Sequence, residues 1–269
     1  AGQMHPEDAR NYLITYVIDS IRDLSPQYVM MENVFMQLQT AINYNGERIL
    51  IPEIIESIFG NDYFIEQKVI DTKFYGVPQQ RKRALILISK KTSNNHWLFP
   101  EYDSKIVTLE EAIGDLPSLD PFIKEAPYRD VFPKYEAKRK RGLEVSKWHY
   151  ARPHVWRNVE AMMHTPTGCS ARKNPVYFPK KKDGTMVGGA PRTYMRMQWD
   201  KAAPTITSYN HTISSFQNVH PGRLIKGTGL YSDARVLTIF EMLRIMSLPD
   251  NWNIPDWASE SLIRKVIGE

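Results

Sequence analysis

Hydrophobic positions in the first ninety residues follow two different spacings. Apolar side chains recur every three or four residues over 8–23 and 51–59, which predicts two helices. Three shorter apolar runs predict strands, at residues 28–31, 63–70 and 84–89. The order helix–strand–helix–strand, followed by a further strand after a short turn, predicts an α/β sheet with an antiparallel edge pair.

The pattern changes after about residue 90. Proline and glycine become frequent, and aromatic and basic residues dominate until about residue 198, which indicates a loop-rich second domain entered through a helix at 109–113. Regular apolar spacing returns at 236–246 and predicts a helix that ends before Pro249. We therefore divide the chain into three parts: 1–90 in an α/β domain, 91–235 as a smaller loop-rich domain, and 236–269 as a helix and tail returning to the first domain.

Composition restricts the class of protein. With 42% hydrophobic and 24% charged residues among 269, the chain has the make-up of a globular protein rather than a disordered one. No run of 18 apolar residues suggests a membrane span, and the first residues lack the pattern of a signal peptide. The single cysteine, Cys169, excludes an internal disulfide and fits a reducing cytoplasm.

The net charge of +5 is unevenly distributed. Residues 134–182 contain 13 Lys and Arg against 3 Asp and Glu, a local balance of +10, and the rest of the chain is mildly acidic. Aromatic residues interleave these cations. Although a basic run is often only a solvated surface, this combination favours contact with a nucleic-acid backbone.

Two polar blocks lie beside the predicted strands. Glu32-Asn33-Val34 follows the first run, and a block from Gln79 to Arg83 leads into the third. Arg81 and Arg83 alternate into that strand, so their side chains are expected on the same side of it. Planar, permanently charged guanidinium groups suit a phosphate, a carboxylate or a pyrimidine carbonyl oxygen. The plainer alternatives are a solvated strand start for the arginines and a surface ion pair for Glu32.

Together these blocks resemble Glu-Asn-Val and Gln-x-Arg-x-Arg of the cytosine-5 DNA methyltransferases of bacterial restriction–modification systems. Three further segments extend the resemblance, in the family's order, over nearly the whole chain. Residues 8–13 resemble the Asp-x-Arg block, 203–207 the Pro-Thr-(Ile/Leu) element, and 235–244 the late helix Arg-x-Leu-Thr-x-x-Glu-x-x-Arg.

The resemblance implies a fold, a cofactor and roles for residues. The fold would be part of a doubly wound, Rossmann-like sheet that uses S-adenosyl-L-methionine, with a loop-rich target-recognition domain. Glu32 would supply a proton near the ring nitrogen of cytosine, Arg83 would face its carbonyl oxygen, and Arg81 would lie by phosphate or cofactor. The remaining implied roles are cofactor binding by Leu13, Asn33 and Gly268, and structural support by Gln79, Asn33, Arg235, Glu241 and Arg244.

The substrate implied is duplex DNA, from which the target cytosine is flipped out because its reacting atoms are inaccessible inside the helix. Phosphates would be held by the basic residues Lys138, Arg139, Lys140 and Arg141, with further DNA contacts from Thr205 and Ile206. Bases would be read from about Tyr150 to Met197. The target sequence does not follow, since recognition regions carry no transferable code.

The chain also departs from the family pattern. The glycine-rich cofactor loop and the Pro-Cys-Gln block with its nucleophilic cysteine have no counterpart, and residues 266–269 resemble only the opening of the last cofactor block. We therefore expect a complementary segment or subunit to supply them, because Cys169 lies in the recognition region and no metal-ligand pattern is visible. The alternatives are a non-catalytic DNA-binding subunit of a split enzyme and, less in keeping with the long recognition region, an RNA cytosine methyltransferase.

Overall fold

The computed structural model describes residues 9–181 and 183–269. The chain forms two compact units, each described here by itself. Unit 1 consists of Ala1–Thr72 and Arg81–Asp103, and unit 2 consists of Lys73–Gln80 and Ser104–Glu269. The division of the sequence at residues 90 and 235 stays a prediction. The chain passes from one compact unit to the other near residues 72, 80 and 103.

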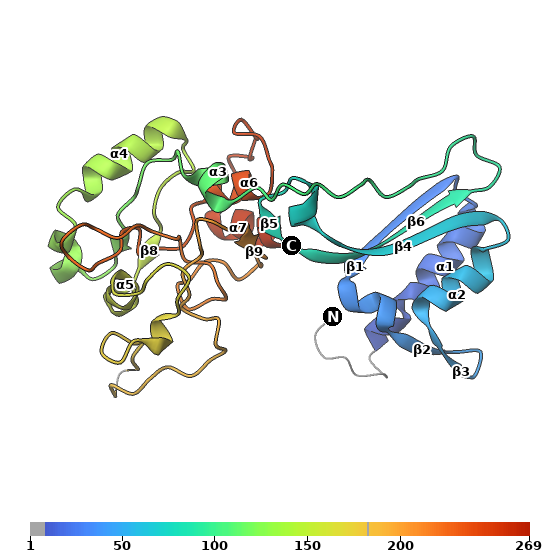
Figure 1. Ribbon diagram of the computed structural model, residues 1–269, viewed down its shortest axis with the longest axis horizontal. Helices are drawn as coiled ribbons and strands as arrows, with labels where there is room; N and C mark the ends of the chain where they lie inside the picture. The colour runs from blue at the N-terminus through green and yellow to red at the C-terminus, as the bar shows by residue number, and fades with distance from the viewer. Residues whose placement is uncertain (1–8, 182) are drawn as a thin grey trace. The chain divides into compact units, whose positions relative to one another are not determined.

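Unit 1 is built on a three-stranded sheet in the order β1 (Tyr28–Val34), β6 (Lys82–Lys90), β4 (Tyr63–Asp71) (Figure 1). β6 is antiparallel to both neighbours, with Met31 opposite Ile86 and Ile65 opposite Ile88. The predicted α/β class and antiparallel pairing are confirmed, and β6 occupies the middle position rather than an edge.

The helices of unit 1 cover one face of this sheet. They are η1 (Ala9–Tyr12), α1 (Leu13–Leu24), η2 (Phe35–Gln39) and α2 (Ile51–Phe59). Ile18, Ile55 and Ile86 belong to a shared apolar core, which is why the three- and four-residue spacing of isoleucine predicted both helices. The first predicted helix begins as a 3-10 turn at Ala9, and Asp8 lies outside the described residues.

Two other features of unit 1 escaped the sequence analysis. A hairpin joins β2 (Ala41–Tyr44) to β3 (Glu47–Leu50) through Asn45-Gly46, both with positive φ (53° and 86°), the conformation that an Asn-Gly turn favours. Residues after β6 run back along the sheet, where the Trp97 ring stacks on Tyr28 at 5.1 Å and its backbone N–H donates to Ser89.

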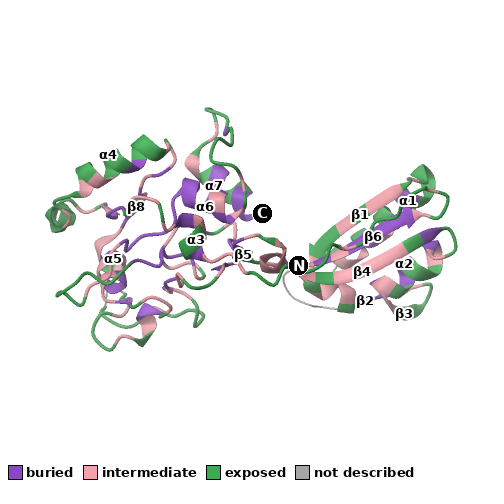
Figure 2. Cartoon of the chain, turned by 45° about the horizontal axis from the view of Figure 1, so that its top comes forward, coloured by how far each residue is buried: buried purple, intermediate pink, exposed green. Residues whose placement is uncertain are grey.

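Unit 2 combines short helices with long irregular segments. Its helices are α3 (Leu109–Ile113), η4 (Ala126–Val131), α4 (Tyr135–Val145), α5 (Trp156–Met163), η5 (Ala171–Lys173), α6 (Ile239–Ile245) and α7 (Glu260–Gly268), and η3 (Thr72–Tyr75) lies at the junction with unit 1. Two parallel strand pairs are present, β5 (Gln79–Gln80) with β9 (Ala203–Pro204), and β7 (Phe122–Ile123) with β8 (Pro153–His154). Figure 2 shows α6 largely buried and α4 largely exposed.

The helix predicted at 236–246 begins three residues later. Thr238 is extended and its hydroxyl accepts the N–H of Glu241, so it caps α6 rather than lying inside it. Leu237 belongs to the core together with Leu243 and Ile267 of α7. Residues 236–269 therefore share a core with residues 104–235 in the described chain. Their return to the catalytic domain stays a prediction.

Candidate functional site

Glu32 and Arg83 meet across neighbouring strands of unit 1. In the pairing of β1 with β6, Glu32 lies opposite Leu85 and Val34 lies opposite Arg83, which puts Glu32 and Arg83 on one face as diagonal neighbours. Arg83 Nε lies 2.5 Å from Glu32 Oε1, and Arg83 Nη1 donates to the Lys82 carbonyl at 2.9 Å. The Glu32 side chain is 51% exposed and that of Arg83 20%, so the carboxylate is open to an incoming ligand.

Arg81 belongs to the same charge cluster but not to the strand. β6 begins at Lys82, which corrects the expectation that Arg81 and Arg83 alternate within one strand. The Arg81 carbonyl accepts the N–H of Thr72 at 3.1 Å, so the backbone is fixed there. Burial lowers the pKa of the Arg81 guanidinium, the positive charge of Arg83 lowers it further, and Glu32 opposes the shift. Two cations therefore share one carboxylate.

Gln79 and Gln80 precede this cluster in β5 of unit 2. The buried Gln79 amide donates from Nε2 to Met246 Sδ at 2.8 Å, just beyond α6. The Gln80 carbonyl accepts the Thr205 hydroxyl at 2.7 Å. The role expected for Gln79, holding the local backbone, stays a prediction. The hydrogen bond to Met246 is the contact through which Gln79 would fix this backbone.

The three residues expected to bind a cofactor differ in what they offer. Leu13 is exposed at the start of α1, and Asn33 Oδ1 accepts the Val34 N–H at 2.7 Å in unit 1. Gly268 lies in unit 2, where a Cβ would approach the backbone of Thr207 and Ser208 to 2.2–2.3 Å. Gly268 therefore allows α7 to lie close to this backbone, and the expected cofactor contact stays a prediction.

The basic residues of α4 fall into two classes. Lys138 Nζ lies 2.5 Å from Asp120 Oδ1, and its side chain is only 28% exposed. Arg139 lies 3.7 Å from Glu136 at the surface. Lys140 and Arg141 are exposed on the same helix. Lys138 is thus a structural ion-pair partner of Asp120, whereas Lys140 and Arg141 are placed to meet solvent or a ligand.

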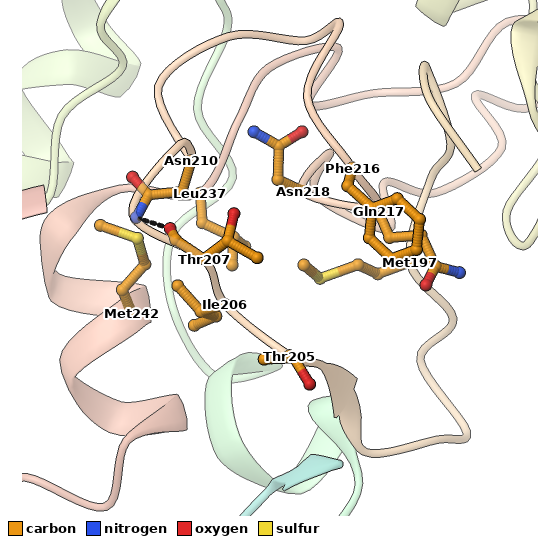
Figure 3. A pocket seen from close by; sticks show the side chains of 10 residues that line it. All are labelled: Met197, Thr205, Ile206, Thr207, Asn210, Phe216, Gln217, Asn218, Leu237 and Met242. Carbon is orange, nitrogen blue, oxygen red and sulfur yellow. Dashed lines mark hydrogen bonds between the residues drawn. The ribbon is translucent and has the colours of Figure 1, made fainter. Parts of the chain in front are cut away.

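Thr205 and Ile206 both line a small cavity in unit 2. Ile206 is 4% exposed and lines a small cavity with Met197, Leu237 and Met242, and Figure 3 shows these side chains around it. The cavity holds about 10 Å³, room for about one water molecule and far too little for a base. The Ile206 side chain is part of the core, and the DNA contact expected of it stays a prediction.

Arg235 and Glu241 form a buried ion-pair network. Arg235 Nη2 lies 2.9 Å from Asp233 and 2.8 Å from Glu241. Burial opposes ionisation of Glu241, but the charge and hydrogen bonds of Arg235 outweigh it, with a contribution from His220 once that ring is protonated in acid, and lower the Glu241 pKa to about 2. Burial lowers the pKa of His220 to about 4, so this imidazole is neutral at pH 7. Arg244 pairs at the surface with Asp115 and Asp250, both at 2.7 Å.

Arg196 lies in the stretch predicted to read bases, and the sequence analysis did not single it out. It is fully buried, and its guanidinium donates to the carbonyls of Thr165, His220 and Met162 at 2.8–2.9 Å. Burial lowers its pKa to about 9. No local pattern distinguishes this arginine from its exposed neighbours, because the loops that surround it are distant in sequence. Arg196 therefore holds loops together and does not read bases.

Three further observations concern the cysteine, possible metal ligands and the helices of the described part of the chain. Cys169 is exposed. Among the described residues, no group of three His, Cys, Asp or Glu side chains could hold a metal ion. Within the same residues, no helix has the length and apolar character required to cross a bilayer.

Comparison with known proteins agrees with this geometry. The family model described as C-5 cytosine-specific DNA methylase matches residues 1–269. The type II methyltransferase M1.HgaI of Avibacterium volantium is 45% identical over 97% of this chain and 67% of its own length. The type II methyltransferase M.DdeI of Desulfomicrobium norvegicum is 27% identical over 94% of this chain and 60% of its own length. This chain therefore spans about two thirds of these relatives.

Solved structures show the same fold at low identity. A putative DNA modification methyltransferase from an Escherichia coli prophage superposes with a TM-score of 0.52 at 17% identity, covering 97% of this chain and 73% of that one. DNMT2 of Spodoptera frugiperda gives 0.51 at 14% identity, covering 95% of this chain and 66% of that one. The fold is that of the α/β methyltransferases, and the chain belongs to the C-5 cytosine-specific DNA methylase family.

Proposed function

We propose that this chain is part of an enzyme that transfers a methyl group from S-adenosyl-L-methionine to carbon 5 of a flipped-out cytosine in a specific duplex DNA sequence. The observation that carries the proposal is the Glu32–Arg83 pair with Arg81 beside it, in a chain of this family. Its relative M1.HgaI is named a type II methyltransferase, which supports a role in restriction–modification in the bacterial cytoplasm.

The chemistry requires charge stabilisation on the cytosine ring. Carbon 5 is unreactive until a thiolate adds to carbon 6, and the negative charge that then develops must be met near the ring nitrogen and the carbonyl oxygen. A carboxyl group suits the nitrogen because it can donate a proton, and a guanidinium suits the oxygen. Glu32 and Arg83 provide these two groups side by side.

The contact between Glu32 and Arg83 also has to change during the reaction. In the ion pair the Glu32 carboxylate accepts from Arg83 and has no proton to donate. A cytosine entering between the two would draw Arg83 toward its carbonyl oxygen. The Glu32 carboxyl group, protonated from solvent, would then donate a hydrogen bond to the ring nitrogen. The half-exposed Glu32 carboxylate permits this exchange.

S-adenosyl-L-methionine, the cofactor of this family, supplies the methyl group when bound. Leu13 and Phe35 expose apolar side chains in unit 1, which fit an adenine ring or the methionine carbon chain. Asn33 is exposed at the end of β1 and retains its amide N–H groups for a polar contact. A cofactor contact of Gly268 stays a prediction, and the backbone of Thr207 and Ser208 lies close to it.

We further propose that a segment carrying the Pro-Cys-Gln nucleophile and the glycine-rich loop completes unit 1. β1 lies at the edge of the sheet, and Met30 on it is 62% exposed. Leu24, also exposed at 77%, ends α1. Large apolar side chains at a sheet edge indicate a surface that another element covers. The proposal leaves open whether that segment belongs to the same polypeptide or to a second subunit.

A methyl-transfer assay tests the proposal. Labelled S-adenosyl-L-methionine and duplex DNA are incubated with three preparations. They are the 269-residue chain, a polypeptide that joins this chain to a segment carrying Pro-Cys-Gln (the longer protein), and a mixture of the chain and that segment as a separate fragment. We expect labelled cytosine with the longer protein or the mixture, but not with the chain alone. If transfer RNA is labelled and DNA is not, the substrate is RNA and the proposed DNA substrate is wrong. DNA binding without label under any condition would favour a non-catalytic specificity subunit.

A further inference from the structure

A half-open pocket lies in unit 2, formed by residues of β7, η4 and the first turn of α4. It holds about 340 Å³, within the range of about 300–1,000 Å³ that is typical of ligand sites. Ile123, Phe132 and Pro133 contribute apolar wall, and the rest of the lining includes aromatic rings and charged groups. The cytosine site proposed above does not use this pocket.

Hydrogen bonds and an ion pair fix the walls of the pocket. Arg129 donates from Nε and Nη2 to the carbonyls of Ile123 and Lys124 at 3.1 and 3.2 Å. Lys138 of α4 lies 2.5 Å from Asp120, which precedes β7. Because these walls are already held in place, a ligand would have few side chains to order on binding.

Two aromatic rings provide a stacking surface in the pocket. The ring centroids of Phe122 and Tyr135 lie 5.4 Å apart, and both side chains are half-buried. Burial raises the pKa of the Tyr135 hydroxyl, and the positive charges of Arg139 and Arg129 oppose this shift, so both cations lie near this ring. Aromatic rings with cations beside them suit a nucleobase and its phosphate.

The charged groups of the pocket match the two ends of a nucleotide. Asp130 and Glu136 line the pocket, and carboxylates accept hydrogen bonds from the exocyclic amino groups of adenine, cytosine and guanine, which thymine lacks. Arg129 has Nη1 outside its two backbone hydrogen bonds, and Arg139 is only loosely paired with Glu136, at 3.7 Å. Guanidinium groups of this kind suit a phosphate.

We propose that this pocket binds one unpaired nucleotide whose base carries an amino group, with the base against Tyr135 and the phosphate at Arg129 and Arg139. It is an additional nucleotide site, because the proposed function assigns the target cytosine to Glu32 and Arg83. Binding to the 269-residue chain measures it, so its test does not depend on methyl transfer. A nucleotide in a DNA strand and a free nucleotide present the same chemistry, and the experiment separates these two sources.

Probes that contain 2-aminopurine, a fluorescent purine with an exocyclic amino group, test the proposal. They are a duplex with one unpaired 2-aminopurine, the same duplex with that base paired to thymine, and the free 2-aminopurine deoxyribonucleoside monophosphate. We expect the unpaired duplex to bind at least about fivefold more tightly than the paired one, because stacking one base on an aromatic ring gives a gain of about this size.

The other outcomes of this experiment are also decisive. Binding of the monophosphate without a preference for the unpaired duplex would keep the pocket and assign it to a free nucleotide. Equal binding of the two duplexes, without binding of the monophosphate, would refute the proposal.

Variants of Tyr135 test the stacking surface. Tyr135→Leu removes the ring and should weaken binding of the unpaired nucleotide about five- to a hundredfold, whereas Tyr135→Phe keeps the ring and should bind like wild type. Tyr128→Leu is the matched control, because Tyr128 belongs to η4 but its ring stacks on Trp156 at 5.0 Å. This control should bind like wild type. An equal loss in Tyr128→Leu and Tyr135→Leu would indicate general destabilisation and overturn the proposal.

The identity of the base tests the carboxylates. In the wild-type chain, an unpaired thymine should bind more weakly than an unpaired adenine, because thymine has no exocyclic amino group. Asp130→Asn should narrow this difference with little effect on the fold, since Asp130 is exposed. Equal binding of thymine and adenine to the wild-type chain would contradict the role of the carboxylates. Displacement of the probe by arginine amide but not by deoxyadenosine monophosphate would assign the pocket to a cationic side chain and overturn the proposal.

Discussion

At the scale of single residues, the candidate chemistry depends on how one carboxylate is shared. Glu32 bonds to Arg83 and also interacts with the charge of Arg81. Guanidinium groups at this place suit a site where negative charge builds up on a ring. The contact alone would also suit an ordinary surface ion pair, worth about 0–1 kcal/mol. Substitution distinguishes these two interpretations.

Arg83→Lys and Glu32→Gln should both slow the reaction of the longer protein. Lysine keeps the charge but loses the planar fork, and glutamine cannot donate a proton, so we expect losses of about 10²- to 10³-fold in kcat. DNA affinity and cofactor binding should stay near wild type, as measured by filter binding and calorimetry. The Glu32→Gln variant should also trap fluorocytosine DNA more slowly. Turnover near wild type in either variant would remove that residue from the mechanism.

At the scale of elements, α6 depends on polar residues that are buried. Thr238 and Glu241 form a capping box, and Glu241 also binds Arg235 inside unit 2. His220 lies nearby, with its Nδ1 accepting the Gly222 N–H at 3.1 Å. A buried network of this kind is stable only while each group keeps its ionisation state.

This network predicts an acid-sensitive unit 2. Burial lowers the pKa of His220 to about 4 and that of His154 to about 3, whereas in an unfolded chain both bind a proton near pH 6.5. The unfolded state therefore gains protons first, and the free energy of unfolding should decrease as pH falls from 6.5 to 4, with a further loss toward pH 2 as Glu241 is protonated.

Urea titrations followed by tryptophan fluorescence measure this dependence, since five of the six tryptophans lie in unit 2. His220→Asn, which keeps an acceptor for Gly222 but does not titrate, should flatten part of the slope. A free energy of unfolding that is constant between pH 6.5 and 4 would contradict the prediction.

The helix α4 allows phosphate contact to be separated from structural pairing. Replacing both Lys140 and Arg141 by Ala should reduce the slope of log affinity for DNA against log salt by about 1.8, because each phosphate contact contributes about 0.9. Lys138→Ala should leave that slope unchanged and destabilise unit 2 by about 1–3 kcal/mol, since it leaves Asp120 without its cation. Salt titrations of DNA binding and thermal unfolding decide between these effects. A flatter slope for Lys138→Ala would assign it to DNA instead.

At the scale of the whole molecule, each unit has a core of its own, and unit 1 also exposes large apolar side chains. The core formed by Ile18, Ile55 and Ile86 is separate from the core of unit 2 that includes Leu243 and Ile267. Unit 1 nevertheless exposes Leu13, Leu24 and Met30. Side chains of this size on a sheet edge and a neighbouring helix are what the proposed additional segment would cover.

Measuring the free energy of unfolding of both the 269-residue chain and the longer protein tests whether this face is covered. Leu24→Ser combined with Met30→Thr should change the free energy of unfolding of the 269-residue chain by less than about 0.5 kcal/mol, because both side chains are exposed there. In the longer protein the same pair should cost about 1–3 kcal/mol if the face is buried. Ile18→Ser, at a position that is 2% exposed, should destabilise both proteins and serves as the control. Equal small effects of the pair in both proteins would show that the face stays open.

The sequence by itself determined the elements whose signal is local. Apolar runs located β1, β4 and β6, the isoleucine spacing of α2 predicted that helix residue for residue, and the ordered blocks around Glu32 and Arg83 indicated the family. The hairpin at Asn45-Gly46 also carried a local signal, which the analysis did not use. Helix α4 gave no apolar periodicity, because its residues are mostly charged and its helix is fixed by its surroundings.

Only the tertiary structure decided which polar residues are partners. In the sequence, three residues look like members of a nucleic-acid surface: Lys138, Arg196 and Ile206. In the structure, Lys138 pairs with Asp120, Arg196 donates to three backbone carbonyls, and Ile206 lies in the core. The pairing of β5 with β9 likewise brings the Thr205 hydroxyl to the Gln80 carbonyl, a contact between distant segments of unit 2. Burial and ion pairing depend on segments 18 to 125 residues apart in the chain, and no local spacing of residues encodes such a contact.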